Sequence, residues 1–418
     1  MMRTQWEILD TPLVQGIKAV GVGRKGSRSM DKDLSRKVME DIRQVDKNSP
    51  ALGAFLGALF IKGVSETEQD IFDVLPNQAK EDPSVLVDWL APDVDETIRK
   101  LCRRLITKDT LNKDEAEKLG DFLFSEEPGD VLRGMAASIL RVRYETAEEY
   151  DGIRLSLEKT FSPAFQDKTP KGMPIVQIAE PFDGVDHSYI LTPLLAGYIQ
   201  SKGYRVVSQC APSPGPKNIY NLFNIAEALK GTFVVSNQGV LDGNKGAFGF
   251  YVNQEQLSPA LAQWIQIRRK IVKRPFLSTL ERFVNPCDAH ILIVSAFHPP
   301  YGEKMLTIAE RAGFEKIIVV RNGLEGGIAF PLKRAAKILC SRKNARGEYE
   351  RSEFEFWAEK EYNMSIPVEE KLDPPALDEN IRLIQEFDQH GATDNELFDL
   401  RVKATRDGIT KALSWVTQ

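Results

Sequence analysis

The pattern of apolar and polar residues divides this chain into two parts. Up to about residue 165, apolar residues recur at helical spacing. From residue 173 onward, short apolar runs rich in β-branched residues alternate with helical stretches, for example 192–202 and 301–312. The runs are Ile175–Ile178, Val206–Val207, Phe233–Val235, Ile291–Val294 and Ile317–Val320. This alternation is typical of a mostly parallel sheet with helices on its faces. We therefore predict an all-helical N-terminal domain and a larger α/β domain.

The helical part contains a sequence repeat. Residues 34–70 and 111–150 each show a polar-start helix, a short loop and a helix rich in small residues. Each copy ends in a predicted capping box, in which Ser65 or Thr146 is followed three residues later by Glu68 or Glu149. Gly53 matches Gly134, Leu59 matches Leu140, Ile61 matches Val142 and Lys62 matches Arg143. Either the helical unit is duplicated, or two amphipathic helix pairs are alike by chance.

These patterns give four predicted regions. Residues 1–75 form a helical unit, and residues 76–165 form a second unit that resembles the first. Residues 166–346 form the α/β domain. Residues 347–418 are acidic and polar, and helices near 378–389 and 394–415 are expected to complete that domain.

Composition is that of an ordinary globular protein, with 42% hydrophobic and 28% charged residues. No apolar run is long enough to span a bilayer, and the N-terminus has no apolar signal core. The cysteines (Cys102, Cys210, Cys287 and Cys340) are widely spaced, which indicates neither a zinc site nor a disulfide framework. We expect a cytoplasmic protein without a membrane partner.

Charge is unevenly distributed. Residues 240–346 hold 17 basic and 8 acidic side chains, whereas residues 347–418 hold 17 acidic and 8 basic ones. One basic cluster comprises Arg268, Arg269, Lys270, Lys273 and Arg274, and a second comprises Lys333, Arg334, Lys337, Arg342, Lys343 and Arg346. A third comprises Arg24, Lys25 and Arg28.

Such stripes bind phosphodiester backbones by counterion release. Tyr251, Trp264, Phe276 and Phe283 would offer stacking surfaces for unpaired bases. The alternative is that the basic face pairs with the acidic C-terminal region of the same chain.

Residues 173–195 carry the candidate chemistry. A buried-looking strand runs into a turn and then into an apolar helix. Such a junction binds phosphate in many α/β enzymes, because a helix N-terminus presents unpaired N–H groups. Here Pro181 removes a donor and Glu180 adds a negative charge where a phosphate loop has glycines. The sequence indicates a fold that binds phosphate at this junction, with altered residues in the loop that would contact the phosphate.

The order of elements and several motifs resemble anthranilate phosphoribosyltransferase and its relatives in glycosyltransferase family 3, over residues 30–60 and 108–340. The family's Gly-Thr-Gly-Gly-Asp-Gly loop falls on residues 179–184, where only Asp183 and Gly184 match. Thr192 survives from the family's Asn-Ile-Ser-Thr stretch. The family's arginine helix falls on residues 268–274. Its magnesium motif Asp-Gly-Leu-Asp-Glu falls on residues 322–326, where Glu325 is the one carboxylate left.

A closer resemblance is to a divergent branch of this family that is similar to nucleic-acid-binding proteins. It rests on the lead-in at residues 22–34 and on the stretches at 174–176, 191–196 and 295–299. The resemblance implies a fold of the nucleoside phosphorylase and phosphoribosyltransferase type. It also implies a homodimer through the helical domain, although the second helical unit departs from the family.

Two functions remain open. In the first, the chain binds nucleic acid, single-stranded in the leading interpretation, through the cluster at 268–274, and makes no tryptophan precursor. In the second, it is an active phosphoribosyltransferase with an altered acceptor. Asp183, Gly184 and Thr192 would then hold phosphoribosyl diphosphate, Glu325 would hold Mg²⁺, and Arg268 an anionic acceptor.

Each of these residues also has an ordinary structural alternative. Asp183 would be a turn residue, Thr192 a helix-start cap and Glu325 a solvated loop residue. His187 in the altered loop and His298 at a strand end are likewise open to a ligand role or a packing role. No catalytic residue is assigned.

Overall fold

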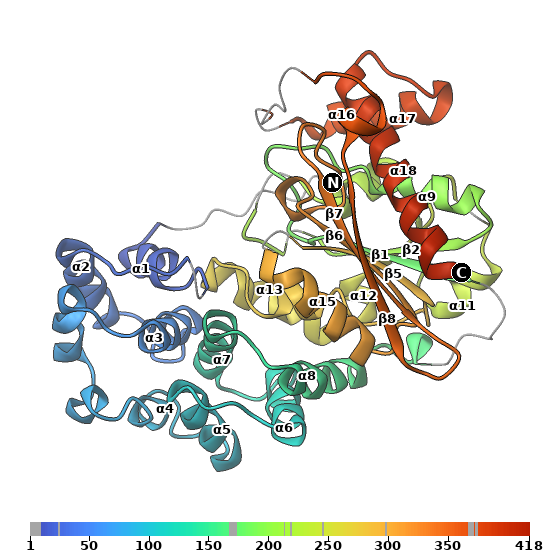
Figure 1. Ribbon diagram of the computed structural model, residues 1–418. Coiled ribbons are helices and arrows are strands. Elements are labelled where there is room, and N and C mark those ends of the chain that lie inside the picture. Colours follow the sequence, from blue (N-terminus) through green and yellow to red (C-terminus); the bar gives the residue numbers. More distant parts are fainter. Residues whose placement is uncertain are drawn as a thin grey trace. The chain divides into compact units, whose positions relative to one another are not determined.

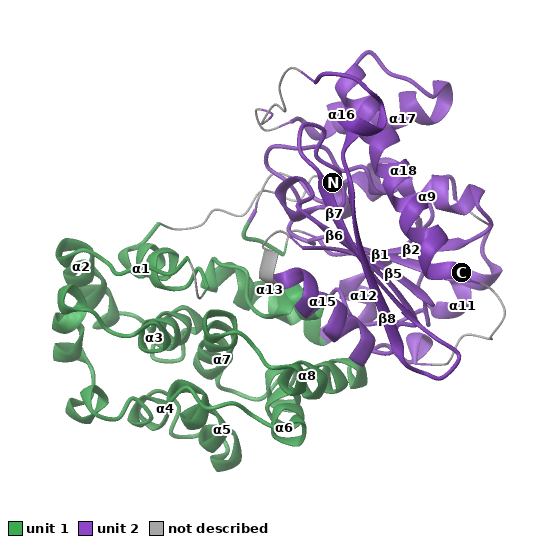
Figure 2. Ribbon diagram, in the orientation of Figure 1, with its two compact units in different colours: residues 1–160, 214–216, 260–281 green, residues 161–213, 217–259, 282–418 purple. Residues whose placement is uncertain are grey.

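A computed structural model describes residues 10–418, apart from 24–25, 167–173, 213, 218–219, 245, 297–298, 367–371 and 373–374. His298, Arg24 and Lys25 therefore lie outside the described residues. The chain forms two compact units (Figure 2). Unit 1 comprises residues 1–160, 214–216 and 260–281, and unit 2 comprises residues 161–213, 217–259 and 282–418.

Unit 1 is helical. Its elements are α1 (Pro12–Val20), α2 (Lys32–Ile42), α3 (Pro50–Lys62), η1 (Glu66–Val74), η2 (Asn77–Lys80), α4 (Val85–Leu90), α5 (Glu96–Ile106), α6 (Lys113–Leu123), α7 (Asp130–Arg143), α8 (Ala147–Lys159), nearly all of α13 (Pro259–Ile271), and α14 (Leu277–Leu280). Residues 260–281 thus group with the N-terminal helices, although the sequence pattern placed them in the α/β domain. The indole N–H of Trp264 donates to the carbonyl of Leu123 at 2.8 Å, which ties α13 to the end of α6.

The same buried carboxylate contacts occur at the two repeated positions. Glu68 accepts hydrogen bonds from the amides of Met30 (2.9 Å) and Ser65 (2.8 Å), and pairs with Lys62 at 2.8 Å. At positions 81 residues further on, Glu149 accepts from the amides of Leu111 (3.0 Å) and Thr146 (2.8 Å), and pairs with Arg143 at 2.6 Å. Both glutamates are 0% exposed. We call residues 30–74 the first segment and residues 111–155 the second segment.

The two segments pack on each other through glycines of α3 and α7, which lie side by side in Figure 1. A Cβ atom on Gly53 would lie 1.8 Å from the carbonyl oxygen of Val131, and one on Gly134 would lie 2.0 Å from that of Pro50. Val131 is the residue that matches Pro50 in the second segment. The contact is therefore reciprocal, as in an isologous interface between two identical subunits.

Unit 2 is built on an eight-stranded sheet in the order β3-β4-β2-β1-β5-β6-β7-β8. The strands are β1 (Ile175–Ala179), β2 (Arg205–Cys210), β3 (Thr232–Phe233), β4 (Phe250–Asn253), β5 (Ile291–Ala296), β6 (Lys316–Arg321), β7 (Ala336–Lys343) and β8 (Tyr349–Phe356). Strands β1 to β6 are parallel, while β7 and β8 pair antiparallel. The predicted fold class is confirmed. The region after residue 347, however, contributes strand β8 as well as helices.

Helices cover both faces of this sheet. The helices of unit 2 are α9 (Thr192–Ser201), α10 (Leu222–Ala228), α11 (Asn237–Asp242), α12 (Gln254–Leu257), α15 (Pro299–Arg311), α16 (Ala358–Glu361), α17 (Leu377–His390) and α18 (Glu396–Thr417), with the short turns η3 (Pro163–Phe165) and η4 (Leu324–Gly326). Helices α9 and α18 pack on the face that carries Val176, Ile293 and Ile318. Among the helices described, none is long and apolar enough to cross a membrane.

Candidate functional site

The candidate donor loop follows β1, at the carboxyl edge of the sheet. Strand β1 lies between β2 and β5, so the chain leaves it toward one side of the sheet and returns later on the other. Ligands of open α/β sheets bind at such a switch point. The sequence-predicted residues Asp183, Gly184 and Thr192 all lie in this part of unit 2.

The donor loop is held in place by close packing and hydrogen bonds with the segment at 220–221. Gly184 has a φ of +84°, and a Cβ there would lie 2.0 Å from the carbonyl oxygen of Tyr220. The side-chain amide of Asn221 donates to the carbonyls of Phe182 (2.9 Å) and Ala211 (2.8 Å). Gly184 is thus required for close packing against the segment at 220–221.

The two polar residues of the predicted donor site are buried. Asp183 is 4% exposed and Thr192 is 1% exposed. Thr192 is the first residue of α9, and Leu191 holds the capping position before it. In this arrangement neither side chain is open to an external phosphate, so a ligand role would require the loop to move.

Glu180 occupies the end of β1. It is 6% exposed, and its Oε1 accepts a hydrogen bond from the amide of Ile328 at 3.2 Å. Burial raises the pKa of this carboxyl, because removal from water disfavours the charged form. The added negative charge expected from the sequence is therefore reduced, and the side chain fills space between the loops that follow β1 and β6.

Glu325 has four donors. Its carboxylate accepts from the amides of Asp186 (2.9 Å) and His187 (2.6 Å), from the hydroxyl of Ser188 (2.9 Å) and from the ammonium of Lys217. Burial opposes ionisation of Glu325, but the lysine and the two amides outweigh it and lower its pKa. Lys217 is a partner that sequence reasoning missed, because it lies 108 residues away.

Mg²⁺ does not fit this arrangement. Magnesium needs several oxygen ligands in near-octahedral geometry. Both oxygens of Glu325 are already engaged, and an ammonium group stands where a cation would bind. No group of three or more His, Cys, Asp or Glu side chains that could hold a metal occurs in the part of the chain that the structure describes. The structure therefore gives Glu325 a lysine partner and does not assemble the magnesium site suggested by the sequence.

Arg268 is not available to a ligand either. It is 4% exposed, and its guanidinium donates to Glu281 at 2.6 Å and to Ser278 at 3.1 Å. A role for Arg268 as a phosphate or acceptor contact stays a prediction, and it would require this internal ion pair with Glu281 to open. The four aromatic residues suggested as stacking surfaces, Tyr251, Trp264, Phe276 and Phe283, are at most 2% exposed and belong to the core.

The other residues of the basic cluster at 268–274 lie near further positively charged side chains. Lys273 and Arg274, which follow α13, line a small hollow together with Arg141 of α7. Burial lowers the pKa of Lys273, and the positive charges of Lys18 and Arg28 lower it further. Lys270 is exposed and Arg269 is half-buried. We call Lys18, Arg28, Arg141, Lys273 and Arg274 the basic cluster of unit 1.

The second basic cluster behaves differently. Lys337 on β7 pairs with Glu355 on β8 at 3.0 Å, and Arg342 pairs with Glu350 at 3.1 Å. The antiparallel register places these side chains opposite each other. For these two residues, the basic face is paired with the acidic C-terminal region of the same chain.

Comparison with known proteins defines the class of fold. Anthranilate phosphoribosyltransferase from Thermus thermophilus superposes with a TM-score of 0.57 at 18% identity, covering 75% of this chain and 89% of that one. The enzyme from Saccharomyces cerevisiae in complex with PRPP and Mg gives a TM-score of 0.55 at 11% identity, covering 77% and 94%. This chain has the fold of an anthranilate phosphoribosyltransferase.

The sequence comparisons go less far. No protein-family model matches the chain. An uncharacterized protein of Aquifex aeolicus (strain VF5) is 23% identical over 235 residues, which are 56% of this chain and 70% of that protein. The sequence comparison therefore names no activity, and the structural comparison shows the fold alone.

Proposed function

We propose that this chain is a protein of phosphoribosyltransferase fold that binds single-stranded nucleic acid through the basic cluster of unit 1. The observation that carries the proposal is the crowding of like charges around Lys273. The charges acting on this half-buried ammonium are those of Lys18 and Arg28. Lys18 also pairs with Asp10 at 2.9 Å. An anion bound beside Lys273 and Arg28 would lower the electrostatic free energy of the remaining like charges.

A polyanion suits this cluster better than a single small anion. The cations come from α1, from the segment after α1, from α7 and from the segment after α13. Exposed Lys270 extends the set. Several cations contributed by separate segments match successive phosphates of a flexible strand. This replaces Arg268 and the buried aromatic residues as the predicted contacts.

Binding of fluorescein-labelled single-stranded DNA, followed by anisotropy at two salt concentrations, tests the proposal. We expect the double variant Lys273→Ala/Arg28→Ala to bind about tenfold more weakly at low salt and to lose about two units of salt slope. Exposed Arg334 and Arg346 provide the matched control, and Arg334→Ala/Arg346→Ala should leave both quantities unchanged. Absence of binding at low salt, or equal losses in the two variants, would refute the proposal.

The second candidate function is a phosphoribosyltransferase with an altered acceptor, which the fold and the position of Asp183, Gly184 and Thr192 favour. It would require the tied loop to open and Lys217 to release Glu325. Calorimetry with phosphoribosyl diphosphate, with and without Mg²⁺, tests it. We expect no heat from the wild type. Heat that depends on Mg²⁺ would instead support the enzyme.

A further inference from the structure

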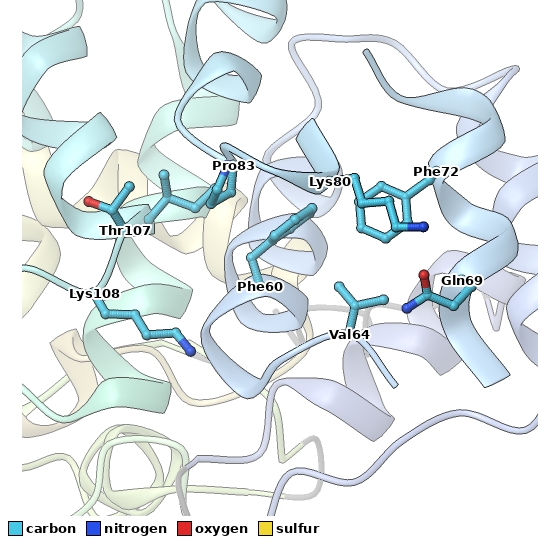
Figure 3. A pocket seen from close by; sticks show the side chains of 9 residues that line it. Phe60, Val64, Gln69, Phe72, Lys80, Pro83, Thr107 and Lys108 are labelled. Carbon is cyan, nitrogen blue, oxygen red and sulfur yellow. The ribbon is translucent and has the colours of Figure 1, made fainter. Parts of the chain in front are cut away.

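A pocket of about 440 Å³ lies within unit 1 and shares no lining residue with the donor loop or the basic cluster. Its walls come from the end of α3, from η1, from the segment at 80–83 and from the residues that end α5. In Figure 3, Phe60 and Val64 lie between Thr107 and Lys108 on one side and Gln69, Phe72 and Lys80 on the other. The volume is in the range of pockets that bind small molecules.

The lining combines carbon walls with cationic groups. Phe60 and Phe72 meet edge to face, with ring centroids 6.0 Å apart. Val64, Pro83 and Ile106 add aliphatic surface. Lys80 and Lys108 are both exposed, and the ammonium of Lys80 lies 5.9 Å from the ring centre of Phe72. None of the residues that line the pocket is acidic.

The second segment does not reproduce this lining. The positions that match Phe60, Val64 and Gln69 are Arg141, Glu145 and Tyr150. A guanidinium and a carboxylate therefore replace two of the carbon-rich walls. The pocket is a property of the first segment and of the linker after it, and does not arise from the repeated framework.

We propose that this pocket binds a small carboxylic acid with an aromatic or branched apolar body. The body would lie against Phe60 and Phe72, where burial of its carbon surface drives binding. The carboxylate would stay at the rim, in the field of Lys80 and Lys108. Charge complementarity selects an acid over a neutral compound of the same shape, because the rim carries two positive charges and the lining has no negative one.

The test compares 2-naphthoate with 2-naphthalenemethanol by isothermal titration calorimetry on the full chain. We expect saturable binding of the acid, with an affinity about fivefold or more above that of the alcohol at low salt. The variant Lys80→Met/Lys108→Met should lose this preference while retaining the alcohol. Lys32→Met/Lys113→Met removes two exposed lysines at matched positions of the two segments and should bind as the wild type does.

A second variant fills the pocket. Val64 is half-buried, so Val64→Trp should occupy the space with little effect on the melting temperature and should abolish binding of both compounds. Equal affinity for acid and alcohol, wild-type affinity in a folded Val64→Trp variant, or no saturable binding would overturn the proposal. Binding of DNA is a separate readout, since Lys80→Met/Lys108→Met should leave it unchanged.

Discussion

The first and second segments of unit 1 share one framework and differ in the side chains they carry on it. Both retain a buried glutamate, a capping box and a glycine at the helix contact. They differ at the end of the second helix, where Phe60 and Val64 of the first segment correspond to Arg141 and Glu145 of the second. Their continuations differ too, because the first leads into η2 and α4 whereas the second leads toward β1. Contacts that hold the two segments together are retained, whereas the side chains at the end of the second helix are not.

The glycine contact gives the largest expected effect. Gly53→Ala and Gly134→Ala should each cost about 3–4 kcal/mol, since the new methyl would collide with backbone oxygen that has no freedom to turn away. The double variant should cost clearly less than the sum, because both changes separate the same two helices. Chemical denaturation measures this.

Gly239→Ala is the control, since a Cβ there would lie 3.3 Å from side-chain atoms of Val234. That substitution should alter stability by less than about 1 kcal/mol. Additive costs for Gly53→Ala and Gly134→Ala would show that the two glycines do not act in one interface.

Removal of either buried carboxylate should have the next largest effect. Glu68→Gln and Glu149→Gln should each cost about 2–3 kcal/mol at neutral pH, because each leaves a cation and buried amides with a weaker acceptor. If the segments are equivalent, the two costs should agree within about 1 kcal/mol. A large difference between the two losses of stability would mean that the buried glutamate of one segment contributes much more to the folded state than that of the other.

Acid unfolding sharpens the comparison further. Burial opposes ionisation of Glu68, but Lys62 and the amides of Ser65 and Met30 outweigh it and lower its pKa below the ordinary value of 4.5. The stabilisation is therefore complete above that value and is lost as pH falls through the lowered pKa. The free energy of unfolding of Glu68→Gln should accordingly fall less steeply below about pH 4.5 than that of the wild type. Parallel curves would contradict this assignment.

Replacing the cation that pairs with Glu68 by the one that pairs with Glu149 should change the free energy of unfolding only slightly. Lys62→Arg places in the first segment the cation that the second segment uses, Arg143. The ammonium of Lys62 also donates to the carbonyl of Gly63 at 2.7 Å, and an arginine can keep both contacts. We expect a change of less than about 0.5 kcal/mol in thermal or chemical unfolding. A loss above about 1.5 kcal/mol would show that the two cation sites differ in shape.

The smallest expected effect is none at all. Because α7 covers the face of α3 that carries Gly53, that face is not open to a second chain, and the homodimer predicted from the sequence would have to use another surface. Light scattering after gel filtration should give the mass of one chain, 47.0 kDa, at every concentration tested. A mass of two chains would contradict this and would indicate a different interface.

Local patterns predicted much of the fold. Strands β1, β2, β5 and β6 were recognised from the short apolar runs that they contain, which occur because both faces of a parallel sheet are covered. Strand β8 was missed because half of its residues are charged and it contains no apolar run. Strand β4 was missed because it is only four residues long and follows a glycine-rich stretch. The repeat was visible because each copy has the same type of capping box and one matched glycine at the same spacing.

The site was less predictable, because its decisive contacts are between distant residues. The stripe of arginines suggested an exposed face, but Glu281, 13 residues after Arg268, turns one of them inward. Glu325 and Lys217 are 108 residues apart, and no local pattern links them. Equally, the pairing of Lys337 with Glu355 depends on the register of β7 and β8. Counting charges along the sequence does not reveal that register.

The reciprocal contact of α3 with α7 has one consequence for how this protein behaves in dilute solution. When the two halves of an isologous contact belong to separate chains, their association follows mass action and weakens as the protein is diluted. Here a tether of the same chain holds the two halves at a constant effective concentration. The contact therefore persists however few copies of the protein are present, and either half is free to change its outer face without having to serve both sides of a symmetric pair.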